Sequence, residues 1–466
     1  MPKINTFDMF SPLDFRYIGD DKAMFDKLSP FLSESAYTKY LLKVEAAILK
    51  ALAQMGVCNI SSAQEVEKAA GSVTPDEFYE EERRIKHNIR ALVNTIKKRV
   101  SEETGKYIHL FATSCDVLDT ATSLRFKDFT EKVLLPDLRE LLHTMIKIAK
   151  DHKDTLQMGR THGQHAVPIT FGFYMANFID RLGRRYNRIR EAKETLTGLY
   201  SGAVGAFNAA SLKFPDDPDK LEELVLDELG LCKPYVRISS QILPPEPLLD
   251  LTYGVISCFS IIANIADDFR HLYRTEIGEI TEVYKKDDVG SSTMPHKINP
   301  RDYENIKSLW KEFMPRINTL FMDQISEHQR DLTNSASGRF TGEIFAAFIY
   351  SVNRLNKTFQ KIVIDKDRMR KNFEMTSSQV VAEPLYISLA LAGHPSAYDE
   401  TRVLTEESRR QNKNVLDVAS AKSDIKKYID RMTEDQKSIL SDPSKYTGIS
   451  SKLAIKVCDY WEDLLG

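Results

Sequence analysis

Apolar residues recur along this chain at the three- and four-residue spacing of an α-helix, and this periodicity decides the fold class. Runs rich in Val, Ile and Thr that alternate with polar residues between turn signals do not stand out. We therefore predict an all-α fold with long bundle helices in the middle of the chain. Two apolar stripes support this prediction: Leu134, Leu138, Leu141, Met145 and Ile148, with Pro136 marking a start or a kink, and Phe171, Met175, Phe178, Leu182, Tyr186 and Ile189.

Residues 248–269 are apolar nearly all round a helical wheel, which is typical of a helix surrounded by other helices. Their most apolar part, residues 255–266, is interrupted by Ser and Asn and is too short to span a bilayer. The chain has 466 residues, which is longer than one compact core normally uses. We predict three domains: short helices and polar turns over residues 1–112, long helices over 113–363, and short helices with turn signals over 364–466.

Composition excludes several classes of function. A formal net charge of −3 with 28% charged residues argues against a general binder of nucleic acids or membrane surfaces. The five cysteines are dispersed without a CxxC pair, which indicates reduced thiols in a cytosolic protein and neither disulfides nor a zinc site. Residues 1–12 lack the apolar run of a signal peptide. We expect a soluble cytoplasmic protein.

The most informative segment runs over residues 290–300, with the sequence GSSTMPHKINP. Gly290, Ser291 and Ser292 predict a mobile, hydroxyl-rich loop. Asn299 and the proline after it suit the N-cap and first position of a helix, and Asp302 is placed like the acidic member of a capping box. A loop that carries the cation Lys297 into a helix N-terminus is suited to binding anions. Local physics alone leaves open a second interpretation, a polar connection between helices.

The full eleven-residue string resembles the signature loop of the fumarase/aspartase superfamily. The resemblance implies that Ser291 is the base that removes a proton beside a substrate carboxylate. Ser292, Lys297 and Asn299 then contact the substrate, and Lys297, Asn299 and loop amides stabilise the charge that builds up as an aci-carboxylate. Mobility of the loop would let it close over the substrate and exclude water.

A second segment, residues 158–168, has the sequence MGRTHGQHAVP, in which Gly159 and Gly163 permit a tight, irregular path. Its two histidines lack a third ligand or a nearby acidic residue, so a metal site is not predicted. For a lone His, a hydrogen-bonded loop residue is the default interpretation. The string, however, resembles the Thr-His-Gly-Gln segment of adenylosuccinate lyases. The resemblance implies that His162 is the general acid that protonates the departing nitrogen.

Further short strings resemble the same family in the same order, and they extend the resemblance over nearly the whole chain. Each is weak alone, because such strings are common on surfaces and at helix caps. Arginines suit the nucleotide-binding strings because the guanidinium grips phosphate or carboxylate oxygens bidentately. The substrate-binding residues that the resemblance implies are Arg16, Tyr17, Lys86, His87, Asn88, Thr113, Ser114, Gln241, Arg330, Ser335 and Arg339, with His109 in the same string as Thr113.

Some positions depart from the family pattern. Phe15 replaces a usual Gly, Asn88 a usual Asp, and Phe111 a usual small residue, while residues 244–247 are proline-rich where relatives carry basic residues or His. Asn88 removes a carboxylate that could orient His87, and the proline-rich stretch affects the contacts near Gln241. None of the departures falls on Ser291, Lys297 or His162.

The resemblance implies a three-domain, fumarase/aspartase-like subunit with a long central helical bundle. It also implies a homotetramer whose active sites are shared between subunits. The implied reaction is anti β-elimination of fumarate from adenylosuccinate, giving AMP, and from succinylaminoimidazole carboxamide ribotide in purine biosynthesis. It requires no metal or organic cofactor. Two alternatives stay open: a carboxymuconate-cycloisomerase-like lyase, whose substrate needs no phosphate grip, and a non-catalytic structural protein on the same scaffold.

Overall fold

The computed structural model describes residues 10–234, 238–283, 293–294 and 296–466. It divides the chain into two compact units. The first unit comprises Met1–Arg139, Arg184–Ile262 and Ser308–Arg354, and the second comprises Glu140–Gly183, Ala263–Lys307 and Leu355–Gly466. The division into three domains at residues 112 and 363 stays a prediction.

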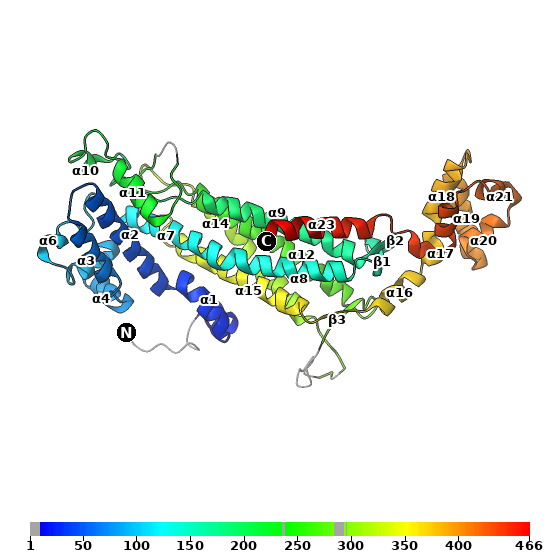
Figure 1. Ribbon diagram of the computed structural model, residues 1–466. Coiled ribbons are helices and arrows are strands. Elements are labelled where there is room, and N and C mark those ends of the chain that lie inside the picture. Colours follow the sequence, from blue (N-terminus) through cyan, green and yellow to red (C-terminus); the bar gives the residue numbers. More distant parts are fainter. Residues whose placement is uncertain (1–9, 235–237, 284–292, 295) are drawn as a thin grey trace. The chain divides into compact units, whose positions relative to one another are not determined.

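Helices dominate the described residues, so the all-α prediction is confirmed (Figure 1). In the first half of the chain they are α1 (Lys22–Leu32), α2 (Glu34–Gln54), α3 (Ile60–Ala70), α4 (Pro75–Ile85), α5 (Asn88–Lys97), α6 (Glu102–Gly105), α7 (Ser114–Phe129), α8 (Leu135–Asp151), α9 (Phe171–Glu194), α10 (Asn208–Ser211) and α11 (Lys220–Leu229). In the second half they are α12 (Glu246–Leu272), α13 (Arg301–Phe313), α14 (Ile317–Met322), α15 (Thr341–Phe359), α16 (Lys366–Glu374), α17 (Ser377–Val380), α18 (Ala382–Leu391), α19 (Ala397–Gln411), α20 (Val415–Ser420), α21 (Ser423–Ile429), α22 (Glu434–Ser441) and α23 (Ser450–Leu465).

The predicted apolar stripes are buried, apart from Ile148, which is partly exposed. All six stripe residues of α9, from Phe171 to Ile189, are at most 8% exposed. Pro136 lies at the second position of α8, directly after a π-helical turn over Thr130–Leu134. A proline cannot donate to the carbonyl four residues earlier, and the π-helical turn relieves the clash of its ring with that carbonyl. The backbone stays helical from α7 through this turn into α8, so Pro136 lies at an irregularity inside a continuous helix and not at a helix start.

Helix α12 is long, apolar and largely buried. Its length and composition alone would let it cross a membrane, but 67% of its most apolar window is buried by the rest of the protein, as in a core helix. In the first unit its Phe259 lies 5.7 Å from Phe348 of α15, between ring centroids. In the second unit its Phe269 lies 4.9 Å from Phe359 of α15. The prediction of a helix surrounded by helices is confirmed.

The described residues also contain two short antiparallel sheets: β1 (Leu156–Thr161) pairs with β2 (Gln164–Thr170), and β3 (Ile280–Glu282) pairs with β4 (Ile362–Ile364). The predicted irregular path around Gly163 is a two-residue hairpin turn, because Thr161 pairs directly with Gln164. His162 and Gly163 have φ of 53° and 73°, as a type I′ turn requires. A Cβ at Gly159 would overlap the carbonyl oxygen of Val167 in the facing strand, so this position needs glycine.

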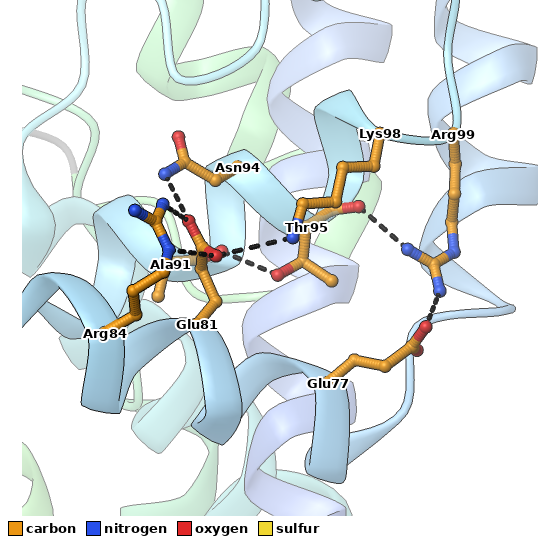
Figure 2. A network of polar contacts seen from close by, with 8 residues as sticks. All are labelled: Glu77, Glu81, Arg84, Ala91, Asn94, Thr95, Lys98 and Arg99. Atoms are coloured by element: carbon orange, nitrogen blue, oxygen red, sulfur yellow. Dashed lines mark hydrogen bonds and ion pairs between the residues drawn. The ribbon is translucent and has the colours of Figure 1, made fainter.

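Helices α4 and α5 are joined by a polar network that Figure 2 shows from close by. Glu81 of α4 is 5% exposed and accepts hydrogen bonds from Arg84 at 2.6 Å and Asn94 at 2.8 Å, with Lys98 at 3.4 Å. Glu77 accepts from Arg99 at 2.5 Å. The contacts of Asn94, Lys98 and Arg99 with the two glutamates tie the helices together. They so fix the ends of the two-residue connection, Lys86 and His87, which leads to Asn88, the first residue of α5.

Candidate active site

The predicted site residues fall into two groups, one in each unit. The second unit contains His162, Lys297 and Asn299. Ser291 and Ser292, the predicted base and its neighbour, lie outside the described residues. The first unit contains Arg16, Tyr17, Lys86, His87, Asn88, Thr113, Ser114, Gln241, Arg330, Ser335 and Arg339.

In the first unit, the start of α7 is organised by a fully buried carboxylate, Asp116. It accepts hydrogen bonds from the backbone N–H of Thr113 at 2.6 Å and of Ser201 at 2.9 Å, and Gly202 N lies 3.3 Å away. Burial raises the pKa of Asp116 although these N–H groups lower it. Thr113 is thus the N-cap residue of α7 and Ser114 its first residue, as the capping interpretation of this pair expects. Both side chains stay partly exposed.

His109, four residues before Thr113, forms a buried acid–base pair with α2. Its Nδ1 lies 2.8 Å from Oε1 of Glu45, whose side chain has no exposed surface. Burial lowers the pKa of His109, but the hydrogen bond and charge of Glu45 and the charge of Asp116 outweigh it, so the pKa is raised. Arg90, near the start of α5, opposes that rise. His109 is therefore biased toward the imidazolium form.

Gln241 and Arg330 come together beside the same helix. The backbone N–H of Gln241 donates to the carbonyl oxygen of Gln329 at 3.2 Å, and its Nε2 donates to the carbonyl oxygen of Ala203 at 2.9 Å. The Arg330 guanidinium contacts Sγ of Cys115 in the first turn of α7. The structure thus gathers His109, Thr113, Ser114, Gln241 and Arg330 around the α7 N-terminus, although they are far apart in sequence.

Asp119, one turn further along α7, is held next to this cluster. Its Oδ2 accepts from the backbone N–H of Leu243 at 3.0 Å. Burial raises the pKa of Asp119 to about 6, against the opposing effects of that hydrogen bond and of the Arg330 charge. The carboxyl group is consequently able to change charge within a mildly acidic pH range.

The connection between α4 and α5 presents Lys86 and His87 to solvent. Lys86 has a left-handed backbone with φ of 61° and ends α4. His87 is the N-cap residue of α5, and its Nδ1 accepts from the backbone N–H of Arg90 at 3.3 Å. An acceptor at Nδ1 leaves the neutral ring's proton on Nε2. The partly exposed Asn88 begins α5.

The predicted phosphate-binding residues lie beside or just before α15. Arg16 and Tyr17 end a π-helical turn, Leu13–Tyr17, and the Tyr17 ring packs edge-on against Tyr350 at 5.3 Å. The Arg16, Ser335 and Arg339 side chains are exposed, and the two latter residues lie just before α15. That Arg16 and Tyr17 act together with the residues around the α7 N-terminus stays a prediction.

In the second unit, His162 stands exposed at the turn between β1 and β2. The base of this hairpin is held by Glu279, a fully buried carboxylate directly before β3. Glu279 accepts from Arg160 Nη2 at 2.5 Å, from Gln157 Nε2 at 3.0 Å and from Asn372 Nδ2 of α16 at 2.9 Å. The three donors fix the strand that leads to His162, while the imidazole itself remains accessible.

The second histidine of this string has a different environment. Nδ1 of His165 lies 2.8 Å from Oγ1 of Thr376. Burial and the charge of Arg160 lower the pKa of His165. It is thus a hydrogen-bonded, largely neutral residue, as the default interpretation of a loop histidine expects.

Lys297 is exposed and Asn299 half-buried just before α13. That helix begins at Arg301, one residue later than predicted, and the carbonyl oxygen of Pro300 accepts its first hydrogen bond from Glu304 N at 3.1 Å. Tyr303, Ile306 and Phe313 form the buried face of this helix and are at most 4% exposed, whereas Trp310 is partly exposed. Within residues 10–234, 238–283, 293–294 and 296–466, no group of three or more His, Cys, Asp or Glu side chains could hold a metal ion.

Sequence analysis missed three carboxylates that organise these residues: Glu45, Asp116 and Glu279. Glu45 and Asp116 carried a signal in the sequence, whereas the setting of Glu279 is visible only in the structure. Glu45 is the one acidic residue in the apolar run from Leu41 to Leu49, Asp116 stands three residues after a Thr N-cap, and Glu279 precedes a strand whose first residue, Ile280, is buried. A lone acid inside an apolar run is costly unless it is paired, which makes it worth singling out.

Comparison with known proteins agrees with the motifs. The family model described as Lyase matches residues 19–312, and the one described as Adenylosuccinate lyase C-terminal matches residues 326–442. The adenylosuccinate lyase of Pyrococcus horikoshii is 34% identical over 97% of this chain and 98% of its own. That of Archaeoglobus fulgidus is 32% identical over 97% and 99%.

Among solved structures, the 3-carboxy-cis,cis-muconate lactonizing enzyme of Pseudomonas putida is similar in fold. It has a TM-score of 0.81 at 23% identity and covers 98% of this chain and 100% of its own. The family predicted from the two motif segments is therefore confirmed over nearly the full length. The chain belongs to the adenylosuccinate lyase family, a group of C–N lyases within the fumarase/aspartase superfamily.

Proposed function

We propose that this protein cleaves the C–N bond of adenylosuccinate to give fumarate and AMP, and that it acts likewise on succinylaminoimidazole carboxamide ribotide. The near-full-length relationship to adenylosuccinate lyases supports this choice of substrates. The geometric observation that carries it is the exposed imidazole of His162 on a hairpin whose base is locked by Glu279. Such a support holds a proton donor in place while leaving it open to a ligand.

In the proposed anti β-elimination, Ser291 removes the proton from the carbon beside a substrate carboxylate. Lys297 stabilises the resulting negative charge, and its exposed ammonium just before a helix is suited to that task. The C–N bond then breaks, its electron pair stays on nitrogen, and His162 donates the proton that nitrogen needs. Ser292 and Asn299 bind the reacting carboxylate.

The first-unit residues hold the rest of the substrate in this proposal. Arg16, Tyr17, Ser335 and Arg339 grip the phosphate, and exposed arginine side chains suit that role. Lys86, His87, Asn88, Thr113, Ser114, Gln241 and Arg330 line the remainder of the site. We further propose a cytoplasmic homotetramer with active sites shared between subunits, acting in purine biosynthesis without a cofactor.

The test is fumarate release from adenylosuccinate by the purified protein, compared with Ser291→Ala and, as a matched control, Ser292→Ala. The wild type should release fumarate, and Ser291→Ala should lower kcat about 10²–10⁴-fold because it removes the base. Ser292→Ala should retain more activity than Ser291→Ala. Light scattering should give about four times the chain mass of 53.2 kDa for all three proteins.

Two results would contradict the proposal in different ways. Normal turnover by Ser291→Ala would refute the assigned base while leaving the activity in place. Failure of the folded wild-type protein to release fumarate would refute the activity. Turnover of a carboxymuconate without phosphate would then identify the cycloisomerase-like alternative, and its absence would favour the structural one.

A further inference from the structure

The pair formed by Glu45 and His109 has no assigned part in the reaction above. Glu45 lies in the middle of α2, on a face otherwise made of Leu, Val, Ala and Ile side chains, and is 0% exposed. Its Oε1 lies 2.8 Å from Nδ1 of His109, whose side chain is 17% exposed. The Glu45 carboxylate is thus buried among apolar side chains, and the partly exposed imidazole of His109 covers its Oε1.

The second oxygen of Glu45 makes the pair unusual. Oε2 is buried and has no hydrogen-bond partner among the described residues. A buried carboxylate with an unpaired oxygen is unfavourable unless a nearby cation compensates its charge. His109 is the one cation-forming side chain with which Glu45 forms an ion pair in the part of the chain that the structure describes. The arrangement therefore favours a carboxylate paired with an imidazolium.

The opposite edge of the ring is available. Nε2 of His109 has no hydrogen-bond partner among the described residues. This nitrogen is not buried, so a ligand can reach it. Its backbone is left-handed with φ of 64°, a conformation that the surrounding contacts must hold in place. The ring precedes the N-terminus of α7, where Thr113 and Ser114 lie and where the helix dipole attracts anions. The charged groups that face it are Glu45 from α2, Asp116 from α7 and Arg90 from α5.

We propose that Glu45 is a positioning residue: it fixes the His109 ring through Nδ1, keeps it an imidazolium, and so directs an Nε2–H donor at an anionic oxygen of the substrate. The inference rests on the proposed function, because it takes the ligand to be a nucleotide or dicarboxylate. A charged donor binds an anionic oxygen about twice as strongly as a neutral one. The anionic oxygen belongs either to the phosphate or to a succinyl carboxylate. The two products distinguish these alternatives, because AMP carries the phosphate and fumarate carries the carboxylates.

The experiment measures the dissociation constants of AMP and of fumarate by calorimetry between pH 6 and pH 9, for the wild type and Glu45→Gln. In the wild type, affinity should be constant below the raised pKa of His109 and should weaken as pH rises through it. Without the Glu45 charge, only Asp116 still raises that pKa against burial and Arg90, so the weakening should move to lower pH. At a pH between the two transitions, Glu45→Gln should bind the ligand that His109 contacts about tenfold more weakly.

Three further variants separate positioning from general damage. Glu65→Gln removes another carboxylate of the first unit, one that accepts from Thr104 and Ser101 and pairs with no histidine, and should leave the pH dependence unchanged. Glu45→Asp keeps the charge and should partly restore the wild-type profile. In a His109→Gln background, Glu45→Gln should cause no further shift, because Glu45 acts through the ring.

The outcomes are distinguishable from those of the proposed function. Suppose that the protein releases fumarate, but that the pH dependence of ligand affinity is the same in the wild type and in Glu45→Gln. This result overturns the inference and leaves the proposed function in place. A full shift by Glu45→Gln in the His109→Gln background also overturns it. If the folded wild type neither releases fumarate nor binds AMP or fumarate, the proposed function fails and the inference fails with it.

Discussion

The buried carboxylate of Glu279 offers a quantitative test of how the hairpin that carries His162 is held. Glu279→Gln keeps the shape of the side chain and removes its charge. Oε1 can still accept from Arg160 and Asn372, which now lie at 2.5 and 2.9 Å. The new amide would face Nε2 of Gln157, a donor that lies 3.0 Å away.

Gln157 can relieve that conflict, because its own Oε1 is buried without a hydrogen-bond partner. If the Gln157 amide flips, Oε1 accepts from the introduced amide and all the hydrogen bonds are kept. The cost then comes from Arg160, which is 17% exposed and would lose its counter-charge. Breaking one side of a buried ion pair costs about 3–5 kcal/mol, and the remaining exposure of Arg160 places the expected loss near 3 kcal/mol.

Urea denaturation followed by circular dichroism would measure this loss at fixed protein concentration. Arg160→Met should cost a similar amount, because it leaves Glu279 unpaired. The double variant should cost less than the sum of the two, since it removes both charges. Additive losses in the double variant, or a loss below about 1 kcal/mol in Glu279→Gln, would refute the view that the ion pair holds the hairpin.

The remaining predictions concern activity, packing and pH. His162→Gln should lower kcat about 10²–10⁴-fold and flatten one limb of the pH–rate profile; an unchanged profile would move the general acid to another histidine. Gly183→Ala should lower the melting temperature because its Cβ would overlap the buried Trp461 ring, whereas Gly342→Ala, with its nearest neighbour 3.9 Å away, should raise it slightly. Because the pKa of Asp119 rises to about 6 on folding, the contribution of this carboxyl group to stability should fall from about pH 4 to pH 6, where the folded state binds the extra proton. Asp119→Asn should remove that slope in pH-dependent thermal melts, and an unchanged slope would contradict the assignment.

Sequence periodicity predicted the long helices because their burial is one-sided and regular. The α9 stripe and the all-round apolar α12 are buried as their patterns require. The β1–β2 hairpin was not predicted, because strands of six and seven residues that contain Arg160, His165 and Pro168 lack the alternation of a half-buried strand. The hairpin depends on a two-residue turn, and His-Gly is not among the common type I′ pairs.

The chemistry-bearing residues were found because they stand in contiguous strings, whereas the groups that orient them were not. Glu45 precedes His109 by 64 positions, and Glu279 follows Arg160 by 119. Residues so far apart in the chain have no characteristic spacing, so the sequence could not predict either the Glu45–His109 pair or the Glu279–Arg160 pair. Tertiary packing brings these groups together: α2 packs against α7, whose N-terminus His109 precedes, and Glu279 accepts hydrogen bonds from β1 and α16.

Backbone strain gathers in the same segments. Four non-glycine residues with positive φ, namely Lys86, His109, Phe111 and His162, lie in strings that resemble the family's site. A left-handed backbone at such residues costs of order 1–3 kcal/mol and persists only where the surroundings hold it. Next to three of them the structure provides a buried carboxylate that accepts several donors or a charged partner: Glu81 before Lys86 (Figure 2), Glu45 beside His109, and Glu279 at the base of the His162 hairpin. Glu45 and Glu279, two carboxylates that local sequence reasoning overlooks, therefore lie beside recognised residues whose backbone departs from its local preference.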